Sequence, residues 1–169
     1  LIGGDYKGQN PDIINAKRTY VRHGAIVHAD ALVKGDGGRV IIWAHKDTYY
    51  RGDTSAKGGR DGGDGGFVEV SGKVHLNFSF QKGIIDVTSP KGSKGMCLLD
   101  PHELTITLPD YRTAKTPKNV LFLDDLKSFS DTTQVKISAD TIYLHPQISI
   151  NDLRSIELET KCLSVSNKY

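Results

Sequence analysis

Arg51, Gly52 and Asp53 form the tripeptide that cell-surface integrins recognise, and their residue types therefore suggest a binding chemistry. Integrin recognition needs the guanidinium and the carboxylate to be displayed on either side of the glycine in an exposed loop. The structural alternative is that Gly52 starts a strand, as its sequence counterpart Gly24 does, with charged residues on either side. Arg51, Gly52 and Asp53 are therefore a candidate adhesion motif that depends on exposure.

A glycine- and aspartate-rich tract, Gly58 to Gly66, is the second segment that could do chemistry. The calcium-binding nonapeptide of other β-rolls has glycine at its fourth place and aspartate at its sixth, where this tract has Asp61 and Gly63. A phosphate-binding loop would need a Lys-Ser/Thr pair and a helix after the glycines. We therefore assign such tracts to structural turns and expect no cofactor, the turn residues being Gly35, Asp36, Gly37, Gly38, Gly63, Asp64, Gly65 and Gly66.

The titratable residues show no spacing that is typical of a catalytic or metal site. His23 and His28 are five positions apart and would face opposite sides of one strand. A carbohydrate-active β-helix enzyme would instead cluster acids on one exposed face of adjacent coils. Asp36, Asp61 and Asp64 lie in glycine turns, where aspartate is favoured for backbone reasons alone. The sequence assigns no catalytic or metal residue, and we expect no enzyme.

Composition excludes several classes of protein. Hydrophobic residues make up 37% and charged residues 25% of the 169 residues, which is typical of a folded chain. A net charge of +2 is too small to indicate a nucleic-acid partner. No apolar stretch approaches the roughly 20 residues of a transmembrane segment. No signal peptide is recognised at the start, and we expect a piece of a longer chain.

Short strands dominate the pattern, because β-branched and apolar runs alternate with turn formers and no sustained helical period occurs. Single helical turns are predicted near Asp124–Phe129 and Asn151–Arg154. The predicted strands are 39–44, 67–70, 84–88, 104–108, 135–139, 142–144, 148–150 and 156–158.

These strands belong to a repeat. Gly35-Asp36-Gly37-Gly38-Arg39-Val40 returns 28 positions later as Gly63-Asp64-Gly65-Gly66-Phe67-Val68. Residues 24–29 match residues 52–57 at the same shift, and a looser copy starts at Gly83. Repeats of 20 to 50 residues are typical of solenoids, and short strands between glycine turns favour stacked coils over hairpins.

The predicted fold is all-β, a right-handed parallel β-helix that forms a fragment of a longer rod. At about 25 residues per coil the chain would hold about six or seven coils. Residues 1–108 would form glycine-rich coils, 109–134 an irregular excursion with a short helix, and 135–169 further coils. Cys97 and Cys162 would then lie two or three layers apart, too far for a disulfide, so we expect two free thiols that act as small buried hydrophobes.

Several of these segments, in this order, resemble the filamentous haemagglutinin type of large exoprotein. Residues 35–44, Gly-Asp-Gly-Gly-Arg-Val-Ile-Ile-Trp-Ala, resemble its GNGGRVIVWA segment, and residues 54–59 resemble ISARGG. Residues 63–73 resemble GDGGFVEVSGK, and Leu98-Leu99-Asp100-Pro101 resembles the LLLDP that closes the block. Residues 1–8 and 16–21 resemble the start of the same region. The resemblance covers about residues 1–108.

The resemblance implies a structural and adhesive stalk of an adhesin that is secreted by the two-partner route to the bacterial surface. It implies an outer-membrane transporter as a partner of the parent chain, and a host or neighbouring-cell receptor or glycan. Neighbouring coils of the parent chain would cover both ends of the segment. The carrier stalk of a contact-dependent toxin remains an alternative, as does a carbohydrate-active β-helix enzyme.

Overall fold

The computed structural model describes residues 1–78, 84–111 and 119–165, and most of its regular structure is strand. The helical elements are η1 (Tyr6–Gly8), η2 (Pro109–Tyr111), α1 (Leu123–Ser130) and η3 (Ile150–Leu153). The strands are β1 (Arg18–Val21), β2 (Ile26–His28), β3 (Arg39–Ala44), β4 (Asp47–Tyr50), β5 (Asp53–Ser55), β6 (Phe67–Gly72), β7 (His75–Phe78), β8 (Ile85–Asp86), β9 (Met96–Leu99), β10 (Glu103–Thr107), β11 (Val120–Phe122), β12 (Gln134–Leu144) and β13 (Ile156–Val165).

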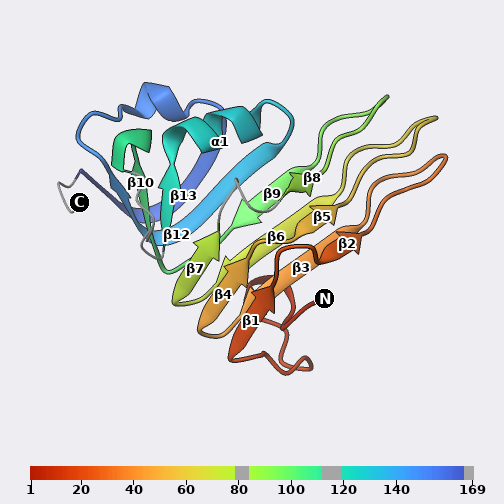
Figure 1. Ribbon diagram of the computed structural model, residues 1–169, viewed down its shortest axis with the longest axis horizontal. Coiled ribbons are helices and arrows are strands. Elements are labelled where there is room, and N and C mark those ends of the chain that lie inside the picture. The colour runs from red at the N-terminus through yellow and green to blue at the C-terminus, as the bar shows by residue number, and fades with distance from the viewer. Residues whose placement is uncertain (79–83, 112–118, 166–169) are drawn as a thin grey trace.

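The strands form three parallel sheets, which Figure 1 shows as neighbouring rows of arrows. One sheet contains β1, β4 and β7, and a second contains β2, β5 and β8. The third and largest follows the order β11-β10-β12-β9-β6-β3, with β13 paired to the other side of β12. The strand-rich architecture and the parallel pairing agree with the all-β prediction.

Pairing partners recur at nearly constant sequence separation. Arg39 pairs with Phe67 and Phe67 with Met96 in the large sheet, and Asp47 pairs with His75 in the β1-β4-β7 sheet. The glycine repeat at a shift of 28 positions therefore coincides with the register of β3 and β6. The expected length of about 25 residues per coil was too short, and the two smaller sheets hold three strands each rather than six or seven.

The predicted match of residues 24–29 with 52–57 was wrong by one position. Ile26 pairs with Asp53, a separation of 27 rather than 28. The corner between β1 and β2 comprises residues 22–25, whereas the corner between β4 and β5 comprises only residues 51 and 52. The glycines of these corners are therefore not structural equivalents. Gly83, where the third copy was predicted to start, lies outside the described residues.

The C-terminal part continues the large sheet with longer strands. The first half of β12 pairs with β9 and its second half with β10, so one strand of 11 residues spans two earlier ones. Residues 135–139 and 142–144 thus belong to a single strand. The helical turns expected near residues 124–129 and 151–154 are confirmed as α1 and η3, whereas the strand predicted at 148–150 is wrong because η3 starts at Ile150. The excursion 109–134 also contains β11, which was not predicted.

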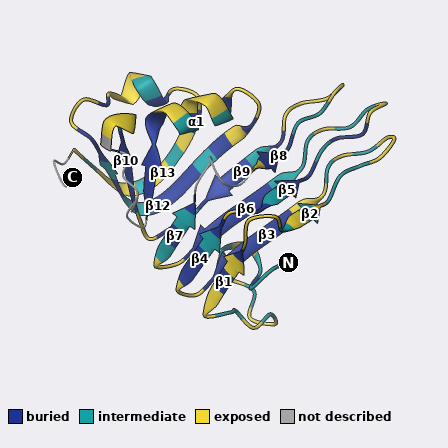
Figure 2. Cartoon of the chain, in the orientation of Figure 1, coloured by how far each residue is buried: buried dark blue, intermediate teal, exposed yellow. Residues whose placement is uncertain are grey.

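A continuous apolar interior runs through the described chain (Figure 2). Alternate residues of the large sheet, such as Val40, Ile42, Val68 and Val70, point into it and are almost fully buried. Near the other end Leu126 of α1 covers the same cluster. No helix in the described parts of the chain is long and apolar enough to cross a membrane.

Candidate functional site

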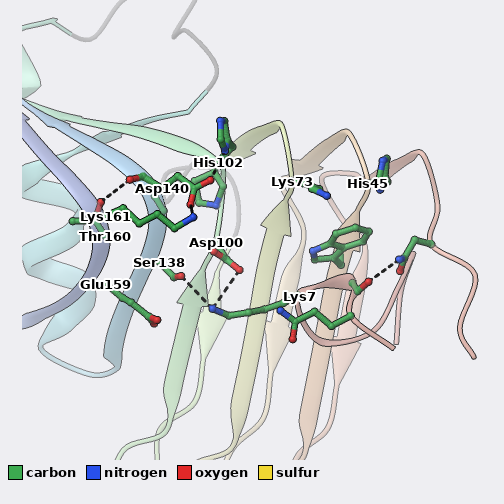
Figure 3. A pocket seen from close by; sticks show the side chains of 16 residues that line it. Lys7, His45, Lys73, Asp100, His102, Ser138, Asp140, Glu159, Thr160 and Lys161 are labelled. Atoms are coloured by element: carbon green, nitrogen blue, oxygen red, sulfur yellow. Dashed lines mark hydrogen bonds and ion pairs between the residues drawn. The ribbon is translucent and has the colours of Figure 1, made fainter. Parts of the chain in front are cut away.

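An open cleft of about 880 Å³ lies on the outward face of the large sheet, where the N-terminal segment passes over the strands (Figure 3). Residues of the N-terminal segment line one side, and residues from β12, β13 and the corner after β9 line the other. The polar and charged members of the lining are Lys7, Gln9, Asn15, His45, Lys73, Asp100, His102, Ser138, Asp140, Glu159, Thr160 and Lys161.

The N-terminal segment is fastened to the sheet edge by backbone pairing. Ile2 forms a parallel bridge with Ile42, and its carbonyl accepts the N–H of Trp43 at 3.0 Å. Gly8, at φ +61°, lies directly against the indole of Trp43, where a β-carbon would approach ring carbons within 2.3 Å. Glycine is therefore required there both for the left-handed backbone and for the close approach. The indole is 3% exposed and forms the floor of this end of the cleft.

Lys7 joins the N-terminal segment to the middle of the sheet. Its backbone N–H donates to both carboxylate oxygens of Glu69 at 3.2 Å. Its Nζ donates to Ser138 Oγ at 3.2 Å and lies 3.6 Å from Asp100 Oδ2. Figure 3 shows the side chain stretched across the strands toward these two partners. One residue thus contacts β6, β12 and the corner after β9.

Glu69 is a fully buried carboxyl group on the outward face of β6. It pairs in register between Ile41 and Leu98, which are also buried beneath the N-terminal segment. Burial raises the pKa of Glu69 to about 7, a rise opposed by the hydrogen bonds from Ser71 and the Lys7 backbone. Burial likewise raises the pKa of Asp100, with Lys7 opposing that rise.

The other wall of the cleft is a chain of ion pairs. Asp140 accepts from Lys161 Nζ at 2.6 Å, and His102 Nδ1 lies 2.8 Å from its other oxygen. The hydrogen bond from Lys161 holds the pKa of Asp140 below its usual range. Glu159 pairs with Lys136 at 3.1 Å. Each carboxylate that lines the cleft therefore has a cationic partner, an arrangement that joins strands and offers polar contacts to a ligand.

The predicted turn residues lie in three stacked arms, at residues 29–38, 56–66 and 87–95, which Figure 1 shows as three parallel extensions. In each arm the returning half donates to the outgoing half, as Gly38 N–H does to the Ala29 carbonyl at 2.6 Å. Aspartates link neighbouring arms: Asp36 accepts from the Asp64 N–H at 2.8 Å, and Asp64 accepts from the Ser93 N–H at 2.7 Å.

The remaining assigned glycines let these arms pack backbone against backbone. A β-carbon on Gly65 would come within 1.9 Å of the Val87 carbonyl oxygen, and one on Gly66 within 2.1 Å of the Gly38 carbonyl oxygen. Gly37 contacts Ala56 and Gly66 in the same way, and Gly35 and Gly63 have positive φ. The eight predicted turn residues are thus brought together in the first two arms.

The candidate adhesion motif lies at the corner between β4 and β5, not in a projecting loop. Arg51 is exposed, but Gly52 is buried against Val21, and Asp53 is the first residue of β5. The backbone N–H of Arg51 donates to the Val21 carbonyl and that of Asp53 to the Ala25 carbonyl, each at 2.8 Å. The tripeptide backbone is therefore fixed in the stack.

Both cysteines are free thiols, as predicted. Cys97 is buried in the core of β9, whereas Cys162 on β13 is exposed, which corrects the expectation that both are buried. Sequence reasoning also missed Lys7 and Glu69. The alternation of Phe67-Val68-Glu69-Val70 places Glu69 outward, but only the N-terminal segment, 62 positions away, buries it.

No group of three or more His, Cys, Asp or Glu residues within the described ranges could hold a metal ion. Comparison of the chain with models of known protein families and with curated protein sequences gave no match. The functional argument therefore depends on the sequence motifs and the geometry of the chain.

Proposed function

We propose that the chain is a stalk segment of a secreted adhesin similar to filamentous haemagglutinin, and that its three sheets are the faces of a right-handed parallel β-helix. In this proposal the segment extends a longer rod, and its function is to hold adhesive surfaces away from the cell. The outward faces of the sheets and arms would carry the contacts with a host or neighbouring cell.

The observation that carries the proposal is the recurrence of parallel pairing in all three sheets. Arg18 pairs with Asp47 at a separation of 29, and Asp47 with His75 at a separation of 28. Ile26 pairs with Asp53 at 27. A chain that returns to each of three sheets after nearly the same number of residues has the connectivity of a spiral, because hairpins would pair antiparallel.

The stacked arms give further support. Asp36 and Asp64 each accept an N–H from the following arm, so the arms repeat the spacing of the strands. Glycine at the contact points allows backbones to approach more closely than any side chain would permit. The same Gly-Asp-Gly-Gly tracts carry the resemblance to the exoprotein family, so the residues that suggest the family also make the stacking contacts.

The proposal includes export of the parent chain through an outer-membrane transporter and a location at the bacterial surface. Its test begins with attachment. Beads coated with the purified chain should attach to epithelial monolayers more than beads coated with Gly65→Val, in which a side chain would enter the space between the arms. Equal attachment of the two preparations would refute the adhesive role.

The stalk role needs a separate measurement on the parent protein. Electron microscopy of that protein should show a rod whose length grows with the number of 28-residue repeats. A compact particle of similar width and length would refute the stalk, whatever the attachment assay shows.

A further inference from the structure

A second groove, of about 400 Å³, opens on the outward side of the sheet that contains β1, β4 and β7. It shares no lining residue with the cleft above the large sheet. We call it the cationic groove, and it is lined by Tyr20, Val21, Arg22, His23, Tyr49 and Arg51.

Two tyrosines form a firm wall of the cationic groove. Tyr20 and Tyr49 are register partners on β1 and β4, and their rings stack with centroids 4.7 Å apart and an interplanar angle of 1°. Tyr20 remains 60% exposed, so its ring edge and hydroxyl are open to a ligand. Val21 is 6% exposed and supplies an apolar floor.

Two arginines stand at equivalent positions at the end of this wall. Val21 pairs with Tyr50, so Arg22 and Arg51 follow the last residues of neighbouring strands. The hydrogen bond from the Arg51 N–H to the Val21 carbonyl, at 2.8 Å, holds the two backbones together there. Both side chains are exposed, and within the described part of the chain neither makes an ion pair or a hydrogen bond.

The charge of the cationic groove is not compensated by the protein. No carboxylate lines it, and Asp47, the acidic residue of β4, is already bound by Arg18 at 2.8 Å and His75 at 2.7 Å. Like charges at adjacent positions of neighbouring strands repel each other. An anion placed between Arg22 and Arg51 would turn that repulsion into two attractive contacts.

We propose that the cationic groove binds the carboxylate-bearing ring of an acidic saccharide. A planar carboxylate matches the fork of N–H donors on each guanidinium. The tyrosine hydroxyl can donate to and accept from sugar hydroxyls, and the ring edges and Val21 can contact the apolar face of a sugar. The volume is within the range of small-molecule sites. Arg51 thereby acts with Arg22 rather than with Asp53, whose carboxylate accepts the Ile84 N–H at 3.2 Å.

This site does not depend on the stalk proposal, because a binding groove on one sheet requires no rod. The test measures binding of trigalacturonate to the purified chain by isothermal titration calorimetry. Its comparison ligands are the carboxyl-reduced trisaccharide and a size-matched dextran sulfate. The variants are Arg22→Gln and Arg51→Gln, and the matched control is Arg60→Gln, which removes one exposed arginine from an arm instead.

Trigalacturonate should bind, and each groove variant should weaken its binding about tenfold while Arg60→Gln leaves it unchanged. The reduced trisaccharide should show no measurable binding. Absence of trigalacturonate binding, an equal loss in Arg60→Gln, or equal binding of the reduced sugar would overturn the proposal. Equally tight binding of dextran sulfate would overturn the assignment to a carboxylate. Circular dichroism should show unchanged folding, since all three arginines are exposed.

Discussion

The backbone N–H of Lys7 donates to both carboxylate oxygens of Glu69, at 3.2 Å each, although the two residues lie 62 positions apart. The contact fastens the N-terminal segment over a row of outward side chains that would otherwise face water. It also leaves a carboxyl group buried between Ile41 and Leu98, where ionisation is unfavourable. Stability should therefore depend on pH through this one group.

Stability should fall as pH rises through the range in which Glu69 ionises. Its pKa is about 7 in the folded protein and 4.5 in the unfolded chain, so between these values the folded state holds a proton that the unfolded state has lost. The sign follows: the penalty is absent below about pH 4.5, grows with pH, and is complete above about pH 7, at about 3 kcal/mol.

Urea unfolding at about pH 5 and about pH 8 measures this effect. Glu69→Gln should remove most of the pH dependence over that interval, whereas Glu103→Gln, at an exposed position, should retain it. If Glu69→Gln and the unmodified chain lose stability equally between the two pH values, burial of Glu69 does not control it.

Gly65→Ala should destabilise the chain by about 3 kcal/mol, because its β-carbon would come within 1.9 Å of the Val87 carbonyl oxygen. Gly24→Ala is the matched comparison: Gly24 has φ +82° but no atom within 4 Å of the added carbon, so only backbone strain of about 1 kcal/mol is expected. Thermal unfolding compares the two. A smaller loss for Gly65→Ala than for Gly24→Ala would contradict the close packing of the arms.

The two thiols should differ sharply in reactivity. Burial raises the pKa of Cys97, whereas Cys162 is exposed on β13. Iodoacetamide should therefore label Cys162 in the native protein and Cys97 only after unfolding, as peptide mapping can show. Rapid labelling of Cys97 without denaturant would mean that β9 is not in the core.

Asp47→Asn should cost about 2 kcal/mol, because Asp47 is bound by Arg18 on one oxygen and His75 on the other. An amide would set an N–H group against one of these donors and would remove the negative charge. Asp61→Asn, at an exposed position in an arm, should change stability by less than about 0.5 kcal/mol. Equal unfolding midpoints for the two variants would show that the Arg18–Asp47–His75 row contributes nothing.

The sequence predicted most of the strands and the register of β3 with β6, because the repeated Gly-Asp-Gly-Gly tract is a direct record of the stacking. It failed where matching residues are not structural equivalents. Gly24 and Gly52 align as letters, but the corner around Gly24 is two residues longer than that around Gly52. Corner length is set by the strand pairing on either side, which a single glycine does not encode.

The candidate site was less predictable than the fold. Lys7 and Glu69 come together because one segment folds over a sheet built from distant residues, and no local pattern indicates that contact. The long β12 was missed for a related reason: Asp140 interrupts its apolar pattern, yet pairing with β13 carries the strand through that position. The cationic groove likewise requires Arg22 and Arg51 to be recognised as neighbours across a corner of variable length.

The unequal separations between paired residues, which range from 27 between His28 and Ser55 to 31 between Asp53 and Ile84, have an evolutionary consequence. Insertions and deletions of one to a few residues in the corners and arms leave the ladders aligned, so such changes can accumulate without selection against them. Duplication of a whole repeat adds a copy that already fits its neighbour. A gene of this kind can lengthen by unequal recombination, while each loop drifts independently in sequence.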